Sequence, residues 1–461
     1  MSEARPVPGS FRDPAGFVFE REGVLYRQVD ASFADSFDRF RSSGLEAALV
    51  GEDLLVPHQD ADLTLAARPG AHAVLRPERV PFVSYPYEWC FGQLRDAALV
   101  TLAAQRLAMS RGFNLRDATA YNVQFLRGRP MLIDTLSFEP IREGEPWIAY
   151  GQFCRHFLAP LALMATRDPR LGMLLRSHLD GIPLDLAAAL LPRRARLRPG
   201  LMIHLSAHSR SGRRAAGRPS RGRGDRGFSE RAFLGLVDSL ESTVRGLEWE
   251  PPDSEWSGYY GDCRTYSADS LRRKEVLVRE LLAEARPSTV WDLGANTGRF
   301  SRIAAEGGAF TVSLDSEPGL VEASYRELSR DGESGVLPLV MDLADPSPRL
   351  GWAHRERMSL ADRGPVDLVM ALALVHHLAI GNNVPLPALG RWLGELGRWA
   401  LVEFVPKSDP QVQEMLALRE DVFGGYTEEG FRSAVEPSFD IVRREPIEGS
   451  DRSLYLLRGR A

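Results

Sequence analysis

The C-terminal part of this 461-residue sequence predicts an α/β domain with a doubly wound, mostly parallel sheet. Three observations lead to this fold class. Short apolar runs recur along the chain, several of them end in a carboxylate, and segments long enough for a helix separate the first of them. Strands that alternate with helices form right-handed βαβ units, and such units build parallel sheets.

The first predicted strand runs into a turn that contains two glycines. An apolar run ends at Asp292, Gly294 and Gly298 follow in the pattern D-x-G-x-x-x-G, and a helix begins near Arg299. Glycine lacks a Cβ, so a ligand can approach the backbone N–H groups closely. A dinucleotide fold would show G-x-G-x-x-G in this turn. The spacing therefore favours an adenosyl cofactor other than a dinucleotide, and it leaves an NAD-dependent oxidoreductase as an outside alternative.

Further strands follow in the order that a doubly wound sheet needs. The second ends at Asp315, about twenty residues past the first, where a ribose acceptor belongs in nucleoside-binding α/β folds. The third ends at Asp342, and the fourth is almost continuously apolar, as a central strand covered on both faces should be. The predicted strands are 309–315, 336–342, 366–374 and 400–405, and 439–443 with 452–457 close the sheet as a hairpin.

These motifs resemble the class I S-adenosylmethionine (SAM) methyltransferases over roughly residues 251 to 461. The resemblance implies a Rossmann-like sheet and SAM as cofactor, with its charged methionine end over the glycine turn. It also places Asp315 at the ribose and Asp342 at the adenine amino group. The cofactor-binding residues that it implies are Asp292, Gly294, Asn296, Gly298, Asp315, Asp342 and Ala373.

A group of aromatic residues precedes the first of these strands. They form either a lid over the cofactor or the packing of a leading helix on the sheet. Lys274 follows them and is one of only two lysines in the chain, the other being Lys407. The aromatic residues are Trp256, Tyr259, Tyr260 and Tyr266.

Residues just after the fourth and fifth strands are the candidates for chemistry. Methyl transfer is an in-line displacement, so it needs orientation, and a base where the nucleophile carries a proton. Ligands of open α/β sheets bind beyond the carboxyl ends of the strands. We therefore assign His376 or His377 as the base, and Glu403 as its orienter or as a substrate ligand.

Motifs that the sequence lacks narrow the range of possible methyl acceptors. No Asn-Pro-Pro-Tyr or Asp-Pro-Pro-Tyr follows the fourth strand, which argues against an exocyclic amine of a nucleobase. No cysteine lies near the carboxyl edge of the sheet, which disfavours methylation of pyrimidine C5 through a covalent adduct. An oxygen or nitrogen atom of a small molecule is the leading acceptor, ahead of a protein side chain or tRNA.

The amino-acid composition bears on binding partners and on localisation. A net charge of −5 does not indicate nucleic-acid or membrane binding, and 44% apolar residues is typical of globular proteins. The three cysteines are scattered, which fits a reducing cytosol and implies no metal site. The sequence also shows no signal peptide and no long apolar run, so we predict a cytoplasmic protein.

An arginine-rich segment separates the two halves. Residues 193 to 226 hold eleven arginines against the single acid Asp225, and 209–227 has almost no large apolar residue. Such a segment cannot bury enough surface to offset its ordering entropy, so we interpret it as a linker. Phosphate-backbone binding is the alternative, although no aromatic residues interleave for base stacking. The predicted organisation is a domain at 1–185, a linker with a connecting helix at 186–250, and a domain at 251–461.

The N-terminal half shows a different order of elements. A strand at 80–89, a helix at 91–111, a D-x-x-x-x-N loop and a hairpin lead to Asp134. This order resembles the α+β catalytic core of protein-kinase-like and aminoglycoside-phosphotransferase-like folds. The resemblance implies Asp117 as the catalytic-loop base, and Asn122 and Asp134 as metal ligands if the site is active.

Departures from that pattern argue against phosphoryl transfer. No glycine-rich phosphate loop is present, and no lysine lies upstream of Lys274, so Arg27 is the only stand-in for the phosphate-pairing lysine. Thr135 and Leu136 replace the expected Phe-Gly after Asp134. We favour a kinase-like scaffold that binds a nucleotide, substrate or partner beside a methyltransferase. A bifunctional phosphotransferase and methyltransferase, and a non-catalytic binding protein, are the other readings.

Overall fold

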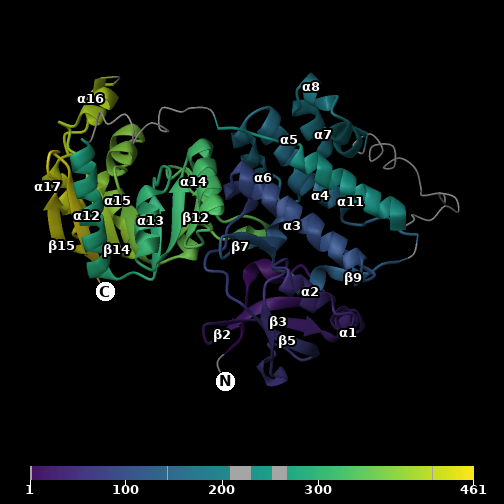
Figure 1. The fold of residues 1–461 in the computed structure, drawn as a ribbon. Coiled ribbons are helices and arrows are strands. Elements are labelled where there is room, and N and C mark those ends of the chain that lie inside the picture. The colour runs from purple at the N-terminus through teal and green to yellow at the C-terminus, as the bar shows by residue number, and fades with distance from the viewer. Residues whose placement is uncertain (1–2, 143, 208–229, 252–266, 418, 461) are drawn as a thin grey trace. The chain divides into compact units, whose positions relative to one another are not determined.

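The computed structural model describes residues 3–142, 144–207, 230–251, 267–417 and 419–460. Its contacts divide the chain into two units, drawn in Figure 1. The first unit is Met1–Glu250 with Leu350–Arg357, and the second is Pro251–Arg349 with Met358–Ala461. The aromatic group predicted as a lid or as packing and the arginines from 210 to 226 lie outside the described residues.

The second unit contains a seven-stranded, mostly parallel sheet, as predicted for the C-terminal half. Its strands are β10 (Thr289–Leu293), β11 (Phe310–Asp315), β12 (Val336–Val340), β13 (Val366–Ala371), β14 (Gly397–Phe404), β15 (Phe439–Pro446) and β16 (Ser453–Gly459). They lie in the order β12-β11-β10-β13-β14-β16-β15. The first five strands in this order run parallel to one another, and β16 runs antiparallel to both β14 and β15.

The strand order reverses at β10. From β10 the chain builds outward through β11 to β12, and then returns to place β13 on the other side of β10. Such a reversal is the topological switch point of an open α/β sheet, where ligands bind beyond the carboxyl ends of the strands. The switch point here lies between the end of β10 and the end of β13.

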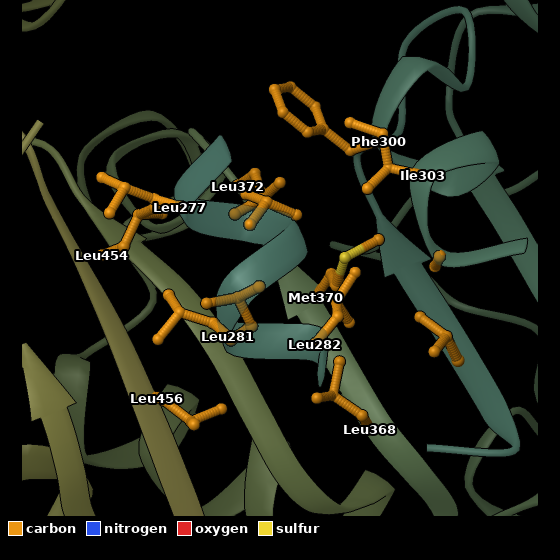
Figure 2. Packing of buried hydrophobic residues seen from close by; sticks show 14 of the residues in the cluster. Leu277, Leu281, Leu282, Phe300, Ile303, Leu368, Met370, Leu372, Leu454 and Leu456 are labelled. Atoms are coloured by element: carbon orange, nitrogen blue, oxygen red, sulfur yellow. The ribbon is translucent and has the colours of Figure 1, made fainter. Parts of the chain in front are cut away.

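Helices α12 (Ala268–Ala285) and α13 (Arg299–Glu306) bury one face of the sheet. In Figure 2, Leu277 of α12 points toward Leu454, and Leu282 lies beside Leu368 and Met370 of β13. The apolar residues of α12 recur three and four positions apart, which gathers them on one helix face. Ser267 caps the helix by accepting from the Ser270 N–H at 3.1 Å.

The remaining helices of this unit include a closely packed pair. A Cβ at Gly390 of α15 would lie 2.3 Å from the Ala434 carbonyl oxygen of α17, so only glycine permits the observed approach. Helix α15 also contacts β13 and β14. The bounds are α14 (Pro318–Asp331), α15 (Leu386–Leu396), α16 (Pro410–Ala417) and α17 (Glu428–Val435).

The first unit opens with a five-stranded antiparallel sheet in the order β1-β2-β3-β5-β4. Long helix α3 (Phe91–Met109) follows, close to its predicted bounds. Strands β7 (Val123–Leu126) and β8 (Arg129–Leu132) pair as the predicted hairpin, and β6 (Phe113–Leu115) pairs with β9 (Phe138–Pro140). The other bounds are β1 (Arg5–Pro6), β2 (Gly16–Arg21), β3 (Val24–Asp30), α1 (Ala34–Ser42), α2 (Leu45–Gly51), β4 (His58–Ala61) and β5 (Ala71–Pro77).

The prediction of a strand at 80–89 is wrong. The last strand before α3 is β5, and 80–89 is irregular apart from a single turn, η4 (Pro86–Glu88). Pro81 and Pro86 carry no N–H group for a ladder. The side chain of Gln124 pairs with this segment instead, accepting from the Ser84 N–H at 2.9 Å and donating to the Ser84 carbonyl at 2.8 Å.

Helices continue into the segment that composition suggested as a linker. Leu201 and Leu205 are buried in this segment, and a ring nitrogen of His204 lies within hydrogen-bond distance of the Tyr150 hydroxyl, at 2.8 Å. No helix in the described ranges is long and apolar enough to cross a membrane. The helices are α4 (Tyr150–Phe153), η7 (Cys154–Leu158), α5 (Ala159–Thr166), α6 (Leu174–Ser177), α7 (Leu184–Leu190), α8 (Arg193–Arg196), α9 (Pro199–Leu201), η9 (Met202–Ala207) and α11 (Glu230–Arg245).

Candidate functional site

The glycine turn at the end of β10 is pinned to the neighbouring strand. The N–H groups of Gly294 and Ala295 both donate to the Leu314 carbonyl of β11 at 2.9 Å. Gly294 has a φ of 75° and Gly298 a φ of 80°, a region that favours glycine. A Cβ at Gly294 would lie 3.2 Å from Leu374 Cδ1. The turn thus keeps its backbone open where a side chain would fill the space beside the switch point.

Asp315 holds the same turn from the second strand. Its Oδ2 accepts from the Asn296 N–H at 2.8 Å, and its Oδ1 accepts from the Glu317 N–H at 2.9 Å. Asn296 adopts a φ of 55°, which is uncommon outside glycine. Burial raises the pKa of Asp315 despite these two hydrogen bonds. The carboxylate therefore ties together the turn after β10 and the end of β11.

Asp292 is buried at the end of β10. The Ser301 hydroxyl of α13 donates to its Oδ2 at 2.6 Å. Burial raises the pKa of Asp292 to about 6, although the Ser301 bond and the positive charge of Lys274 oppose that rise. Asp292 therefore changes protonation within reach of neutral pH, and a cationic ligand would favour its ionised form.

Asp342 and Ala373 follow two other parallel strands at the same edge. Asp342 is exposed, and its Oδ1 accepts from the Ala344 N–H at 2.8 Å in the turn after β12. Ala373 has a φ of 50° in the segment after β13, which costs energy for a residue with a Cβ. Strained backbone of this kind concentrates at functional sites. Five of the seven residues predicted to contact the cofactor follow β10, β12 or β13 at the carboxyl edge, whereas Asp292 is the penultimate residue of β10 and Asp315 is the last residue of β11.

The two adjacent histidines after β13 have different surroundings. His376 is fully buried, and neither of its ring nitrogens has a hydrogen-bond partner in the described part of the chain. His377 begins a π-helical turn, His377–Gly381, and the two ring centroids are 4.2 Å apart. Burial lowers the pKa of both, and for His376 the charges of His377, Arg452 and Lys274 add to the effect.

Glu403, at the end of β14, belongs to a buried charge network. Lys274 Nζ donates to Glu403 Oε2 at 2.6 Å, and Arg452 Nη1 lies 3.5 Å from Glu403 Oε1. Arg452 also donates to both Asp409 oxygens, at 2.7 and 3.0 Å. Within the described residues neither ring nitrogen of His376 bonds to Glu403, and the roles assigned to Glu403 from the sequence stay predictions.

Sequence reasoning overlooked part of this network. The rarity of lysine drew attention to Lys274, whose Nζ also lies 4.6 Å from the centroid of the Phe300 ring. Arg452 carried no such signal, because it is one of many arginines and stands in the connection before β16. Its fully buried position becomes evident only in the folded sheet.

The residues of the first unit for which the sequence suggested kinase-like roles lie around an ion pair. Arg27 Nη1 donates to Asp134 Oδ1 at 2.5 Å, and Ser137 Oγ donates to Asp134 Oδ2 at 2.5 Å. Burial opposes ionisation of Asp134, yet Arg27 and the hydrogen bonds lower its pKa overall. Asn122 Nδ2 donates to Ser137 Oγ at 3.3 Å. The carboxylate predicted to bind a metal is thus neutralised by an arginine of β3.

Asp117 lies in the loop before this ion pair. Its Oδ1 accepts from the Thr119 N–H at 3.0 Å, and burial together with the nearby Asp134 raises its pKa. The Arg357 guanidinium lies 4.1 Å from the Tyr121 ring centroid in the same loop. No group of three or more His, Cys, Asp or Glu side chains among the described residues is arranged to hold a metal ion.

Comparison with known proteins identifies a relative over nearly the full length. The chain is 38% identical over 456 residues to nodulation protein NoeA of Rhizobium meliloti strain 1021, which covers 97% of this chain and 95% of that protein. No family model matches the sequence.

Several solved structures are similar to part of the chain. The N-methyltransferase NodS of Bradyrhizobium japonicum WM9 is 13% identical, with a TM-score of 0.32, and covers 42% of this chain and 99% of its own. Magnesium protoporphyrin IX methyltransferase of Synechocystis PCC 6803, crystallised with SAM, is 19% identical, with a TM-score of 0.32 and coverages of 44% and 90%. The bifunctional kinase-methyltransferase WbdD is 17% identical, with a TM-score of 0.30 and coverages of 47% and 45%. These TM-scores are too low to bear on function.

Proposed function

This chain belongs to the family of nodulation protein NoeA, and we propose that it is a SAM-dependent methyltransferase. One observation carries the proposal: the open glycine turn at Gly294 stands between Asp292 and Asp315 at the switch point of a doubly wound sheet. A nucleoside ligand with a cationic end fits this combination, because a glycine turn and two buried carboxylates meet at the edge of the sheet where such ligands bind.

The residues present fit SAM in the positions that the family resemblance implies. The methionine end would occupy the space beside Gly294 that a Cβ would fill, with Asp292 near its ammonium group. Asp315 would accept from the ribose, and Asp342 from the adenine amino group. Asn296, Gly298 and Ala373 would line the turn and the segment after β13. When bound, SAM supplies a methyl group on a positively charged sulfur.

The transfer itself asks two things of the protein. It must hold the acceptor in line with the methyl group, and it must take up a proton if the nucleophile carries one. His376 and His377 follow β13 beside the switch point, and both remain neutral at physiological pH because burial lowers their pKa values. A neutral imidazole can accept a proton, so these residues serve as base candidates. Glu403 acts by holding Lys274 and Arg452 in place.

We propose a small molecule as acceptor, methylated on oxygen or nitrogen during nodulation, in keeping with the name of the NoeA relative. The net charge of −5 supports a small acceptor over tRNA. A protein side chain is the remaining alternative. The scattered cysteines support action in the cytoplasm.

For the first unit we propose a binding role without phosphoryl transfer. Its support is the Arg27–Asp134 ion pair, because a guanidinium occupies the carboxylate that a magnesium ion would need. The competing reading is a bifunctional enzyme. Magnesium-dependent ATP hydrolysis that disappears in Asp134→Ala would establish that reading, and absence of ATP binding in calorimetry would remove it.

Calorimetric titration of the purified full-length protein with SAM and with S-adenosylhomocysteine tests the methyltransferase proposal. We expect binding in the micromolar range, lost in Gly294→Arg. Failure of both ligands to bind, together with binding of NAD, would replace the proposal with an oxidoreductase.

A further inference from the structure

The fully buried ring of His376 is the least satisfied polar group of the second unit's carboxyl edge. Neither Nδ1 nor Nε2 has a partner within the ranges that the structure describes. Buried polar atoms in folded proteins nearly always find a partner, so an orphaned ring needs one from outside the fold. Its position after β13, next to the switch point, is where an acceptor would meet the methyl group of SAM.

The charged and titratable groups that act on His376 come from three places in the fold. Lys274 lies on α12, Arg452 precedes β16, and His377 follows on the same turn with its ring centroid 4.2 Å away. The positive charges of Arg452 and Lys274 act on the His376 ring and disfavour its protonation. A second cation in this space would be repelled in the same way, because burial leaves little water to screen it.

The carboxylates of this region are already engaged with those cations. Glu403 Oε2 accepts from Lys274 at 2.6 Å, and Asp409 accepts from Arg452 at 2.7 and 3.0 Å. All four side chains are at most 5% exposed. An ammonium group placed against His376 would therefore meet two cations whose counter-charges are taken.

We propose that the methyl acceptor presents an uncharged hydroxyl group to His376, so that the reaction is an O-methylation. This inference rests on the methyltransferase function proposed above and names its acceptor class. A hydroxyl can donate its proton to an unpartnered imidazole nitrogen without adding charge to the cluster. An ammonium has no lone pair for attack until it has lost a proton, and Glu403 and Asp409 already accept from Lys274 and Arg452.

The chemical step balances with these groups alone. The hydroxyl oxygen attacks the methyl carbon of the sulfonium, an O–C bond forms, and the C–S bond breaks with its electron pair remaining on sulfur. The hydroxyl proton moves to an unpartnered ring nitrogen of His376. The products are a methyl ether, S-adenosylhomocysteine and one proton.

The inference can be tested on the full-length protein without knowing the natural acceptor. Protein carrying ¹⁵N-labelled histidine is saturated with S-adenosylhomocysteine and titrated with methanol, then separately with methylammonium chloride, and the ring ¹⁵N signals are followed by NMR. These probes have the same heavy-atom count and differ in carrying a hydroxyl or an ammonium. His376→Asn identifies the His376 signals, and His377→Asn assigns the neighbour if the first variant does not fold.

We expect the His376 signals to shift in a saturable way with methanol and to ignore methylammonium at the same concentration. His72 is the internal control, since its ring is 29% exposed and bonded to Asp38, so it reports only on bulk solvent. A His376 ring that ignores methanol, or that follows methylammonium, would overturn the hydroxyl inference. Failure of S-adenosylhomocysteine to bind in the first step would instead overturn the proposed methyltransferase function.

Discussion

Lys274 and Glu403, 129 residues apart in the chain, form a buried ion pair with 2.6 Å between Nζ and Oε2. The lysine is 2% exposed and the glutamate is fully buried. The pair joins α12 to the end of β14, and Lys274 also lies over the Phe300 ring in the first turn of α13. A helix that precedes β10 is thereby linked to the sheet edge where we expect the acceptor.

Removing one partner of this pair should destabilise the fold. Lys274→Met leaves the Glu403 charge buried without its lysine partner, with Arg452 Nη1 still 3.5 Å from Oε1, so we expect a loss of about 3–5 kcal/mol in urea denaturation. Lys274→Met with Glu403→Gln should recover much of the loss. Arg279→Met, in an exposed pair with Glu306, is the control and should cost less than about 1 kcal/mol. Equal losses at both sites would contradict the assigned burial.

A side chain at Gly294 should block the cofactor and leave the fold in place. Gly294→Arg would fill the space beside Leu374, and its positive φ adds strain of about 1–2 kcal/mol. Gly308→Arg is the matched control, because Gly308 also has a positive φ but has nothing within 4 Å of a Cβ. We expect similar losses of melting temperature and, in calorimetry, loss of SAM binding for Gly294→Arg only. Normal SAM binding by Gly294→Arg would move the methionine end elsewhere.

The sheet of the second unit could be predicted closely because each strand is a distinct apolar run. Asp292 and Asp315 could be brought together from sequence for the same reason, since parallel strands end at one edge. The place of β16 between β14 and β15 could not, because the pairing of a terminal hairpin depends on which edge of a distant strand is free. That insertion is what brings Arg452 beside Glu403.

Predictions from the local sequence failed where a side chain, rather than a neighbouring strand, pairs with the backbone. The run at 80–89 is apolar and aromatic, yet its pairing comes from the Gln124 amide rather than from a strand. Sequence also could not distinguish His376 from His377, since adjacent residues differ in burial only after the turn following β13 is built. In the first unit, Arg27 could be named as a replacement for lysine, but its pairing with Asp134 needed the folded β3.

Asp315 should contribute directly to SAM affinity, in addition to its contribution to the stability of the fold. Asp315→Ala removes the proposed ribose acceptor and the bonds to the Asn296 and Glu317 N–H groups, so we expect SAM affinity to fall by about 1–3 kcal/mol in calorimetry. Asp367→Ala is the control, because Asp367 accepts from the N–H groups of Ser288 and Thr289 at the opposite edge of the sheet. It should lose stability but keep its SAM affinity. A similar affinity loss in both variants would mean that Asp315 acts through stability alone.

The pH dependence of SAM binding should follow Asp292. Burial raises its pKa to about 6 in the free protein, and a cationic methionine end favours the ionised form, so binding below that pH must release a proton. Affinity measured by calorimetry should therefore be constant above about pH 7 and fall by about tenfold per pH unit well below 6. Asp292→Asn keeps the shape of the side chain but cannot titrate. We therefore expect this variant to bind SAM more weakly, with an affinity that does not vary with pH through residue 292. Glu322→Gln, which removes a buried carboxylate paired with Arg326 on α14, should retain the wild-type curve. A wild-type slope in Asp292→Asn would assign the proton to another residue.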